Sequence, residues 1–243
     1  MSNLAGIHPV REALRAGRPL DSVWIVKGAA GPRLQEIIDL CRERRIPVKF
    51  ELRPALDRAA ATASHQGVVA FGATEHYASL EDTAAGGGLH VVLDGIEDPH
   101  NLGAIIRTAH AAGAAAVVIP ERRAAGLTET VQRSASGALA YLPVVRVANI
   151  SRALEYLKEQ RYWVYGLDER GKESYDTVEY TAPTALVLGA EGKGLHQTVA
   201  KHCDFLVSIP MSGGSESGEP GVASLNVSVA AGVVLFEWKR RRG

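Results

Sequence analysis

Two polar side chains, Asn101 and Arg107, lie six residues apart in a stretch that is otherwise rich in alanine and isoleucine. The stretch, DGIEDPHNLGAIIRTAHAAGA at residues 94–114, reads as the end of a strand, an acidic turn and a helix. An amide can orient a hydroxyl group, and a guanidinium can bind a phosphate through two parallel hydrogen bonds. A lone cation on such a helix is also an ordinary surface feature, so a phosphate site and a solvated side chain both fit.

A carboxylate, Glu191, lies in the glycine-rich segment LGAEGKGL at residues 188–195. The segment follows an apolar predicted strand, and a carboxylate in a sharp turn at that place is a candidate for positioning a ligand. The segment is not a P-loop, because Lys193 is followed by Gly194 where that motif has Ser or Thr. A glycine turn that only joins a strand to a helix is the alternative.

The third segment begins with SIPM at residues 208–211 and continues with SLNVSVAAGVVLFEW at residues 224–238. Ser224 is placed to cap the last predicted helix, and Asn226 is polar near the start of a helix that is mostly apolar. A second cap is the alternative role for Asn226. Residues 212–223, SGGSESGEPGVA, have the composition of a mobile loop, which suits either a lid or a tolerated insertion.

The apolar patterns around these segments predict two α/β units. Short helices and strands alternate over residues 1–75, which is typical of a compact α/β sandwich. Residues 76–87 are polar and run into three consecutive glycines, which indicates a linker. From residue 88 onward, β-branched strands alternate with helices, among them 101–112, 127–137, 150–160, 194–203 and 224–239, which predicts a parallel sheet covered on both faces. Ligands of such sheets bind at the carboxyl ends of strands, where the three segments lie.

The composition excludes several classes of protein. The chain is 46% hydrophobic and 22% charged, and none of its apolar runs approaches the roughly 20 residues that span a bilayer. The first residues lack the apolar core of a signal peptide, and Cys41 and Cys203 are far apart in the sequence. We therefore expect reduced thiols and a cytoplasmic protein. The histidines and cysteines show no zinc-like spacing, so we expect no metal site.

The charge is distributed unevenly between the two units. The formal net charge is zero, yet residues 1–75 contain eleven Lys and Arg against eight Asp and Glu, and the remainder contains sixteen against nineteen. A basic front unit can attract RNA or DNA, although an excess this small also fits an ordinary solvated surface.

Taken together, the three segments resemble the three motifs of the SpoU (TrmH-like) family of RNA ribose 2′-O-methyltransferases, within the SPOUT group. The matching residues are NLGAIIR at 101–107, LGAEGKGL at 188–195, and IPM at 209–211 with SLNVSVA at 224–230. GIHPVREAL at 6–14 and HQGVVA at 65–70 resemble the family's small RNA-binding domain, which is akin to ribosomal protein L30e. The resemblance covers nearly the whole chain and is greatest to the members that methylate a guanosine ribose in 23S rRNA.

The resemblance implies a fold and an assembly. Residues 1–75 would be an L30e-like domain that binds the RNA substrate, residues 76–87 a linker, and residues 88–243 a SpoU methyltransferase domain with a C-terminal trefoil knot. The resemblance also implies a homodimer with the active site near its interface. The alanine-rich helix at 101–112 and the apolar last helix suit such an interface.

The resemblance further implies a cofactor, S-adenosylmethionine, and two sets of site residues. The catalytic set would be Arg107, Asn101, Glu191, Asn226 and Ser224. The cofactor-binding set would be Leu188, Gly189, Ile209, Met211 and Leu225, with Gly189 small enough for close backbone approach to a ligand. Arg107 would either clamp an RNA phosphate or accept the proton of the ribose hydroxyl, although arginine is almost always protonated.

Two alternatives to a 23S rRNA guanosine methyltransferase stay open. One is a ribose methyltransferase that acts on tRNA, or on rRNA as a resistance enzyme. The other is an RNA-binding protein that has the same fold without turnover, which the full set of Asn101, Arg107, Glu191 and Asn226 disfavours.

Overall fold

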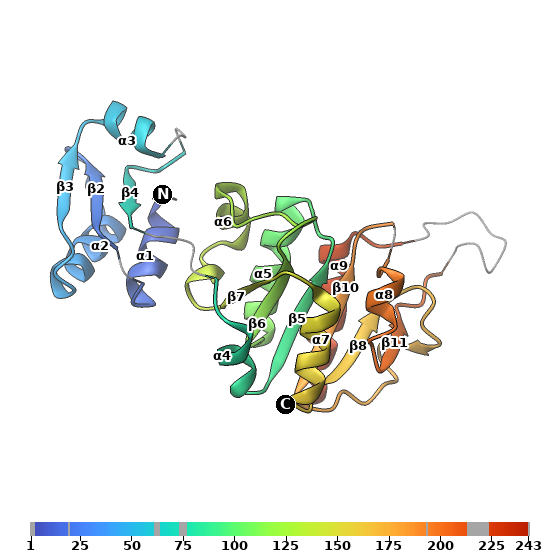
Figure 1. Cartoon of the computed structure of the whole chain (residues 1–243). Helices are drawn as coiled ribbons and strands as arrows, with labels where there is room; N and C mark the ends of the chain where they lie inside the picture. Colours follow the sequence, from blue (N-terminus) through green and yellow to red (C-terminus); the bar gives the residue numbers. More distant parts are fainter. Residues whose placement is uncertain are drawn as a thin grey trace.

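The chain forms two α/β units, each built around its own sheet (Figure 1). The computed structural model describes residues 3–18, 20–60, 64–72, 77–192, 194–212 and 224–242. Within these ranges the front unit has a four-stranded sheet and the second unit a seven-stranded sheet. Lys193 and most of the 212–223 loop lie outside the described residues.

The front unit is the α/β sandwich that the sequence predicts. Its strands pair in the order β1-β4-β2-β3, with β2 and β3 parallel and the other pairs antiparallel. Helices α1 and α2 pack on one face through Val10, Leu14 and Ile37, and α3 packs on the other through Leu56. The elements are β1 (Leu4–Ala5), α1 (Ile7–Arg15), β2 (Ser22–Val26), α2 (Pro32–Glu43), β3 (Val48–Glu51), α3 (Arg53–Ala60) and β4 (Val68–Phe71).

The segment between the two units contains a helix that the sequence analysis does not predict. Helix α4 (Leu80–Ala85) begins after Ser79, whose Oγ accepts a hydrogen bond from the Asp82 amide at 3.0 Å. Leu80 and Ala84 are buried against the second unit, so half of the expected linker is part of a core. The glycines at 86–88 end the helix.

The large sheet is parallel throughout its described pairs, as expected from its β-branched strands. Its order is β7-β6-β5-β10-β8-β11-β9, so after β7 the chain crosses to the other side of β5. This crossing places the carboxyl ends of β5, β10 and β8 next to one another. The strands are β5 (Leu89–Asp94), β6 (Ala116–Pro120), β7 (Val144–Val147), β8 (Trp163–Leu167), β9 (Glu173–Ser174), β10 (Thr184–Gly189) and β11 (Phe205–Ser208).

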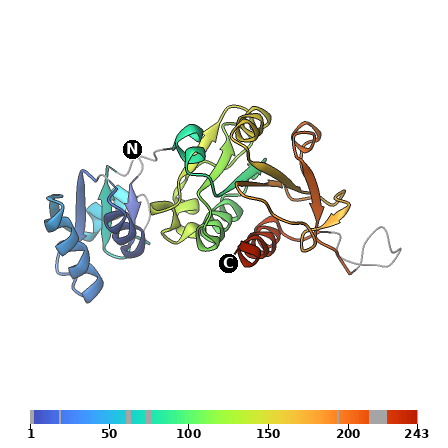
Figure 2. The same cartoon turned by 90° about the horizontal axis from the view of Figure 1, so that it is seen from below.

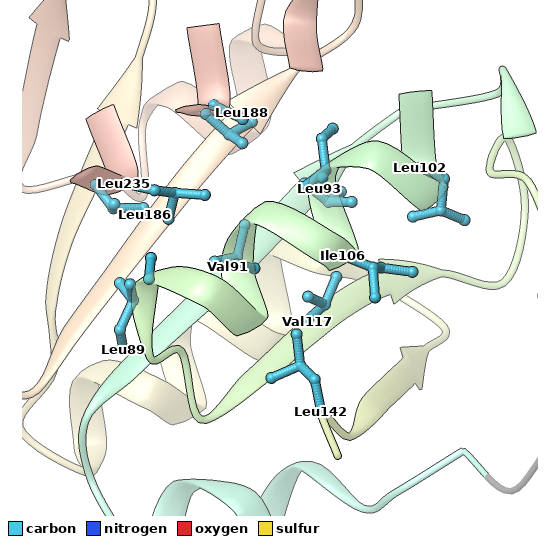
Figure 3. Packing of buried hydrophobic residues seen from close by; sticks show 14 of the residues in the cluster. Leu89, Val91, Leu93, Leu102, Ile106, Val117, Leu142, Leu186, Leu188 and Leu235 are labelled. Atoms are coloured by element: carbon cyan, nitrogen blue, oxygen red, sulfur yellow. The ribbon is translucent and has the colours of Figure 1, made fainter. Parts of the chain in front are cut away.

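Helices cover both faces of this sheet (Figure 2). The buried side chains of β5 alternate between the two faces of the sheet. Val91 and Leu93 face α5, α6 and α9 (Figure 3), whereas Val92 faces α4, α7 and α8. The trefoil knot that the resemblance implies stays a prediction. The remaining elements are α5 (Pro99–Ala112), α6 (Glu129–Ala135), η1 (Ala138–Ala140), α7 (Ile150–Glu159), α8 (Gln197–Ala200) and α9 (Val227–Arg242).

Three helices begin later than the sequence predicts. Helix α6 begins at Glu129 rather than at residue 127. Helix α8 begins at Gln197 rather than at residue 194, because the backbone of His196 is not helical, with ψ of 139°. Helix α9 begins at Val227 rather than at residue 224. None of the helices in the described ranges is long and apolar enough to cross a membrane.

Helix α1 of the front unit contacts the second unit at residues 136–141. The Tyr141 hydroxyl donates to the Glu12 carboxylate, and His8 Nε2 contacts the Ser136 carbonyl oxygen. A Cβ at Gly137 would come within 2.9 Å of both Glu12 Cγ and His8 Nε2, so α1 packs directly on that glycine. Burial would raise the pKa of Glu12, but the bonds from Tyr141 and neighbouring arginines outweigh it and lower that pKa.

The packing of α5 on α6 predicts that Gly103 tolerates no side chain. A Cβ at Gly103 would lie 2.4 Å from Ser134 Cβ and 2.8 Å from the Val131 carbonyl oxygen. Gly103→Ala should therefore lower the free energy of unfolding by about 1–3 kcal/mol, measured by denaturant titration, although Ala normally favours a helix.

Gly86→Ala is the matched control. Gly86 has right-handed backbone, and its new Cβ would meet Thr83 O at 3.9 Å, so stability should change by less than about 1 kcal/mol. If Gly103→Ala were as stable as Gly86→Ala, then α5 and α6 could move apart without loss of folding stability.

Candidate active site

The parallel pairing of β5 with β10 brings the first two motif segments together. Gly189 lies opposite Asp94 in the register, so the loop after β5 and the turn after β10 leave the sheet side by side. Asp98 caps α5 by accepting the His100 amide at 2.9 Å, and this fixes Asn101 in the first turn of that helix. The short turn after Gly189 holds Glu191 nearby.

A bridge of hydrogen bonds joins three of the predicted catalytic residues. Asn226 Nδ2 donates to Asn101 Oδ1 at 3.1 Å and to Glu191 Oε2 at 3.3 Å. Asn226 Oδ1 accepts from the Ser228 amide at 2.9 Å and from the Ser228 hydroxyl at 2.6 Å. Asn226, and not Ser224, therefore caps α9 while it also joins the three motif segments.

All five residues predicted to bind the cofactor line one pocket beside this bridge. The pocket has about 760 Å³ of space, solvent at its mouth included. Its walls are mostly apolar, with Glu169, Glu191 and Ser224 also among the lining residues. The predicted cofactor residues in the wall are Leu188, Gly189, Ile209, Met211 and Leu225.

Gly189 is required by the turn itself. A Cβ at this position would lie 2.2 Å from the carbonyl carbon and oxygen of Gly194 and 2.5 Å from the Leu195 amide. The backbone that approaches Gly189 thus belongs to Gly194 and Leu195, at the end of the same motif segment, and not to a ligand. A side chain here would open the turn that carries Glu191 before it filled the pocket.

Arg107 lies apart from the other predicted catalytic residues. Six residues of helix turn through about 600°, so Arg107 and Asn101 occupy different faces of α5. The Arg107 side chain is exposed, and its Nη1 donates to Ser136 Oγ at 3.4 Å. Arg107 is not among the described residues that line the cofactor pocket or the adjoining space at Asn101 and Glu191.

Asp168 is a buried residue of the pocket that the sequence analysis does not select. It is 4% exposed, and it accepts from Arg170 Nε at 2.6 Å and from the Leu195 amide at 3.2 Å. Burial would raise its pKa, but these bonds outweigh burial and lower it. Its place at the end of the strand that the segment YWVYGLD predicts, residues 162–168, is a sequence signal, although only the fold shows that this strand borders β10.

Asp168 and Asp94 hold the turn after β10 from two sides. Asp94, 6% exposed at the end of β5, accepts the His196 amide at 2.8 Å, one residue beyond the amide that Asp168 accepts. Two carboxylates from the strands on either side of β10 thus bind consecutive amides. This arrangement fixes the turn that carries Glu191.

Asp168→Asn should weaken the turn and change how stability depends on pH. Because the pKa of Asp168 is lowered on folding, its contribution is complete above the unfolded value of about 3.9 and is lost as the pH falls through the folded value. The variant should lose about 1–3 kcal/mol at pH 7 and show a weaker acid dependence below about pH 4, measured by thermal unfolding.

Asp39 on α2 supplies the control, because its side chain is 50% exposed and its ion pair with Arg42 lies at the surface. Asp39→Asn should change stability by less than about 1 kcal/mol and leave the acid dependence unchanged. An Asp168→Asn protein with wild-type stability at every pH would contradict a structural role for this carboxylate.

Comparison with known proteins finds similarity along nearly the whole chain. Residues 88–236 match the SpoU rRNA methylase family, and residues 4–78 match the RNA 2′-O ribose methyltransferase substrate-binding family. A Bacillus subtilis protein assigned to the TrmH family of tRNA/rRNA methyltransferases is 41% identical over 243 residues, covering 98% of this chain and 94% of the relative.

Two further similarities bear on the site. The 23S rRNA (guanosine-2′-O-)-methyltransferase RlmB of Pseudomonas putida is 40% identical over 250 residues, covering 100% of this chain and 97% of the relative. The crystal structure of the SpoU methyltransferase AviRb from Streptomyces viridochromogenes in complex with AdoMet has a TM-score of 0.81 and 27% identity, covering 99% of this chain and 90% of that chain. With both units matched and the three motif segments joined in one site, this chain belongs to the SpoU family of RNA 2′-O-ribose methyltransferases.

Proposed function

We propose that this protein transfers the methyl group of S-adenosylmethionine to the 2′ hydroxyl of a guanosine ribose in 23S rRNA. The observation that carries the proposal is the bridge from Asn226 to Asn101 and Glu191 at the edge of a mostly apolar pocket. The choice of guanosine and of 23S rRNA rests on the similarity to the Pseudomonas putida enzyme.

The pocket residues fit the cofactor. Leu188, Ile209 and Leu225 offer apolar walls for the adenine ring, and the carboxylates of Glu169 and Glu191 can attract a cationic sulfonium or bind ribose hydroxyls. When bound, S-adenosylmethionine supplies an electrophilic methyl group. Met211 and Ser224 line the same pocket.

The polar bridge is suited to orient the RNA ribose. Because the Asn226 amide is already occupied by Asn101 Oδ1 and Glu191, the Asn101 Nδ2 group and the second Glu191 oxygen are left for the substrate. A hydroxyl held between an amide donor and a carboxylate acceptor is fixed in direction, which favours in-line attack. Arg107 would hold an RNA phosphate, since a guanidinium is a poor proton acceptor.

We assign substrate binding to the front unit, residues 1–75, with 76–87 as the connection and 88–243 as the methyltransferase domain. The match of residues 4–78 to a substrate-binding family and the excess of basic residues over residues 1–75 support this assignment. RNA as substrate places the protein in the cytoplasm.

The protein acts as a homodimer in this proposal, with Arg107 of one copy completing the site of the other. Helix α9 exposes Val229 by 52% and Phe236 by 47%, and it packs beside α5. Exposed apolar residues on a helix that begins at the site are suited to an interface between copies. The separation of Arg107 from Asn101 within one chain favours a contribution across that interface.

The purified protein should transfer tritium from S-adenosylmethionine to 23S rRNA transcribed in vitro, at a single guanosine ribose. Arg107→Ala should bind S-adenosylmethionine with unchanged affinity by calorimetry, yet transfer methyl groups at least about 100-fold more slowly in single turnovers. Modification of a tRNA transcript in place of 23S rRNA would overturn the proposed substrate.

Arg107→Lys separates the two roles of the guanidinium. Lysine keeps the charge without the planar fork, so partial recovery of both rate and RNA affinity would indicate a phosphate clamp. Full RNA affinity with a rate as low as that of Arg107→Ala would indicate a proton acceptor.

Mixing two inactive variants tests the shared site. If Arg107 acts across the dimer, an exchanged mixture of Arg107→Ala and Asn226→Ala should recover about a quarter of the wild-type rate, since half of the dimers are mixed and each has one intact site. Each variant alone is the control. No recovery, with subunit exchange confirmed by light scattering and tagged copies, would place Arg107 in the site of its own chain.

A further inference from the structure

A second pocket lies beside the candidate active site at the same edge of the sheet. It has about 590 Å³ of space, open solvent included, and it is lined by Arg122 and Arg123 after β6, by the start of α7, and by His196. Gly95 lines this pocket and also the space next to Asn101 and Glu191. The two spaces are therefore neighbours, separated by one residue of the loop after β5.

Both arginines in this pocket are exposed. The described part of the chain places no hydrogen bond or ion pair on either guanidinium. Arg123 also has a left-handed backbone, with φ of +59°, which L-residues adopt rarely. A tight turn that presents two consecutive, unpaired guanidinium groups to a pocket is an arrangement for binding an anion.

The acidic residue of the pocket is already satisfied. Asp94 is 6% exposed and accepts from the His196 amide at 2.8 Å, while His196 Nδ1 lies 3.0 Å from each of its oxygens. These contacts fix the imidazole ring, whose side chain is 46% exposed and leaves Nε2 for a ligand. The Asp94 carboxylate therefore orients the His196 ring toward a ligand. Because its oxygens already accept hydrogen bonds, it does not meet an incoming anion as an unpaired charge.

The start of α7 adds two backbone donors. Asn149 caps this ten-residue helix by accepting the Arg152 amide at 3.1 Å. The amides of Ile150 and Ser151, in the first turn, have no acceptor within the helix, and both residues line the pocket. Helix amides add to the attraction that the two guanidinium groups exert on an anion.

We propose that this pocket binds a backbone phosphate of the RNA, beside the ribose that is methylated. The proposal rests on the function proposed above. Its donors are guanidinium and backbone amide groups, which suit the oxygens of a phosphate. A phosphate here and a ribose at Asn101 and Glu191 place one RNA strand along the carboxyl edge of β6, β5 and β10.

The double variant Arg122→Gln/Arg123→Gln tests the pocket. Glutamine keeps much of the side-chain length without the charge. Binding of 23S rRNA transcribed in vitro should weaken about 10-fold, and the slope of log K against log salt should fall by about 1 for each lost phosphate contact. Affinity for S-adenosylmethionine should be unchanged, and the single-turnover rate at saturating RNA should stay near that of the wild type.

Arg161→Gln is the matched control. Arg161 is also an exposed arginine with left-handed backbone, φ of +66°, but it precedes β8 at the opposite edge of the sheet. It should keep wild-type RNA affinity and salt slope. Equal effects of Arg161→Gln and the double variant on RNA binding, or no effect of either, would overturn the phosphate pocket. If the wild type still methylates RNA in that case, the proposed function stays intact.

A methylphosphonate scan locates the phosphate. Short RNAs carrying one neutral linkage at successive positions around the mapped methylation site should bind the wild type weakly at one linkage near that site. The double variant should lose no further affinity at the same linkage, because the contact is already absent. Additive losses, or a sensitive linkage far from the methylated ribose, would contradict the proposed path of the strand. A wild type that methylates no RNA would instead overturn the proposed function itself.

Discussion

The pairing of β5 with β10, which sets Gly189 opposite Asp94, is the contact on which the rest of the site depends. The two strands are distant in the sequence, yet parallel pairing makes both end at one edge of the sheet. The loop that leads to Asn101 and the turn that carries Glu191 therefore emerge together. Helix α9 then packs against α5, and Asn226 at the start of α9 donates hydrogen bonds to both Asn101 and Glu191. A shift of one residue in the register would separate these side chains and exchange the residues that face the two covered sides of the sheet.

The turn after β10 owes its shape to groups outside it. Its consecutive amides at Leu195 and His196 bind the carboxylates of Asp168 and Asp94, which belong to the strands on either side of β10. Such carboxylates are stable when buried because amides and a guanidinium satisfy them. Gly189 allows the turn to fold back on itself within van der Waals limits.

The contact between the two units lies close to Arg107. Ser136, in a left-handed conformation at the end of α6, contacts His8 of the front unit through its carbonyl oxygen and Arg107 through its hydroxyl. Gly137 beside it admits helix α1 at close range. The position of the front unit and the position of this guanidinium are thus joined through one residue. In a protein whose front unit binds RNA, this contact would couple substrate binding to the side chain that we propose holds an RNA phosphate.

The sequence by itself determined the class of fold and the family, and it predicted a set of site residues. Periodic apolar runs predict parallel strands covered on both faces because side-chain burial follows local geometry, and polar residues within apolar or glycine-rich segments mark Asn101, Glu191 and Asn226 as candidates. Tertiary structure decided which strands are neighbours, and with that the roles of Asp94 and Asp168. It also decided that Asn226 caps α9 in place of Ser224, that α4 lies in the expected linker, and that Arg107 stands apart from Asn101. The contacts of Asp94 and Asp168 with the turn after β10 are long-range, and they depend on strand order, which periodicity along a single chain does not encode.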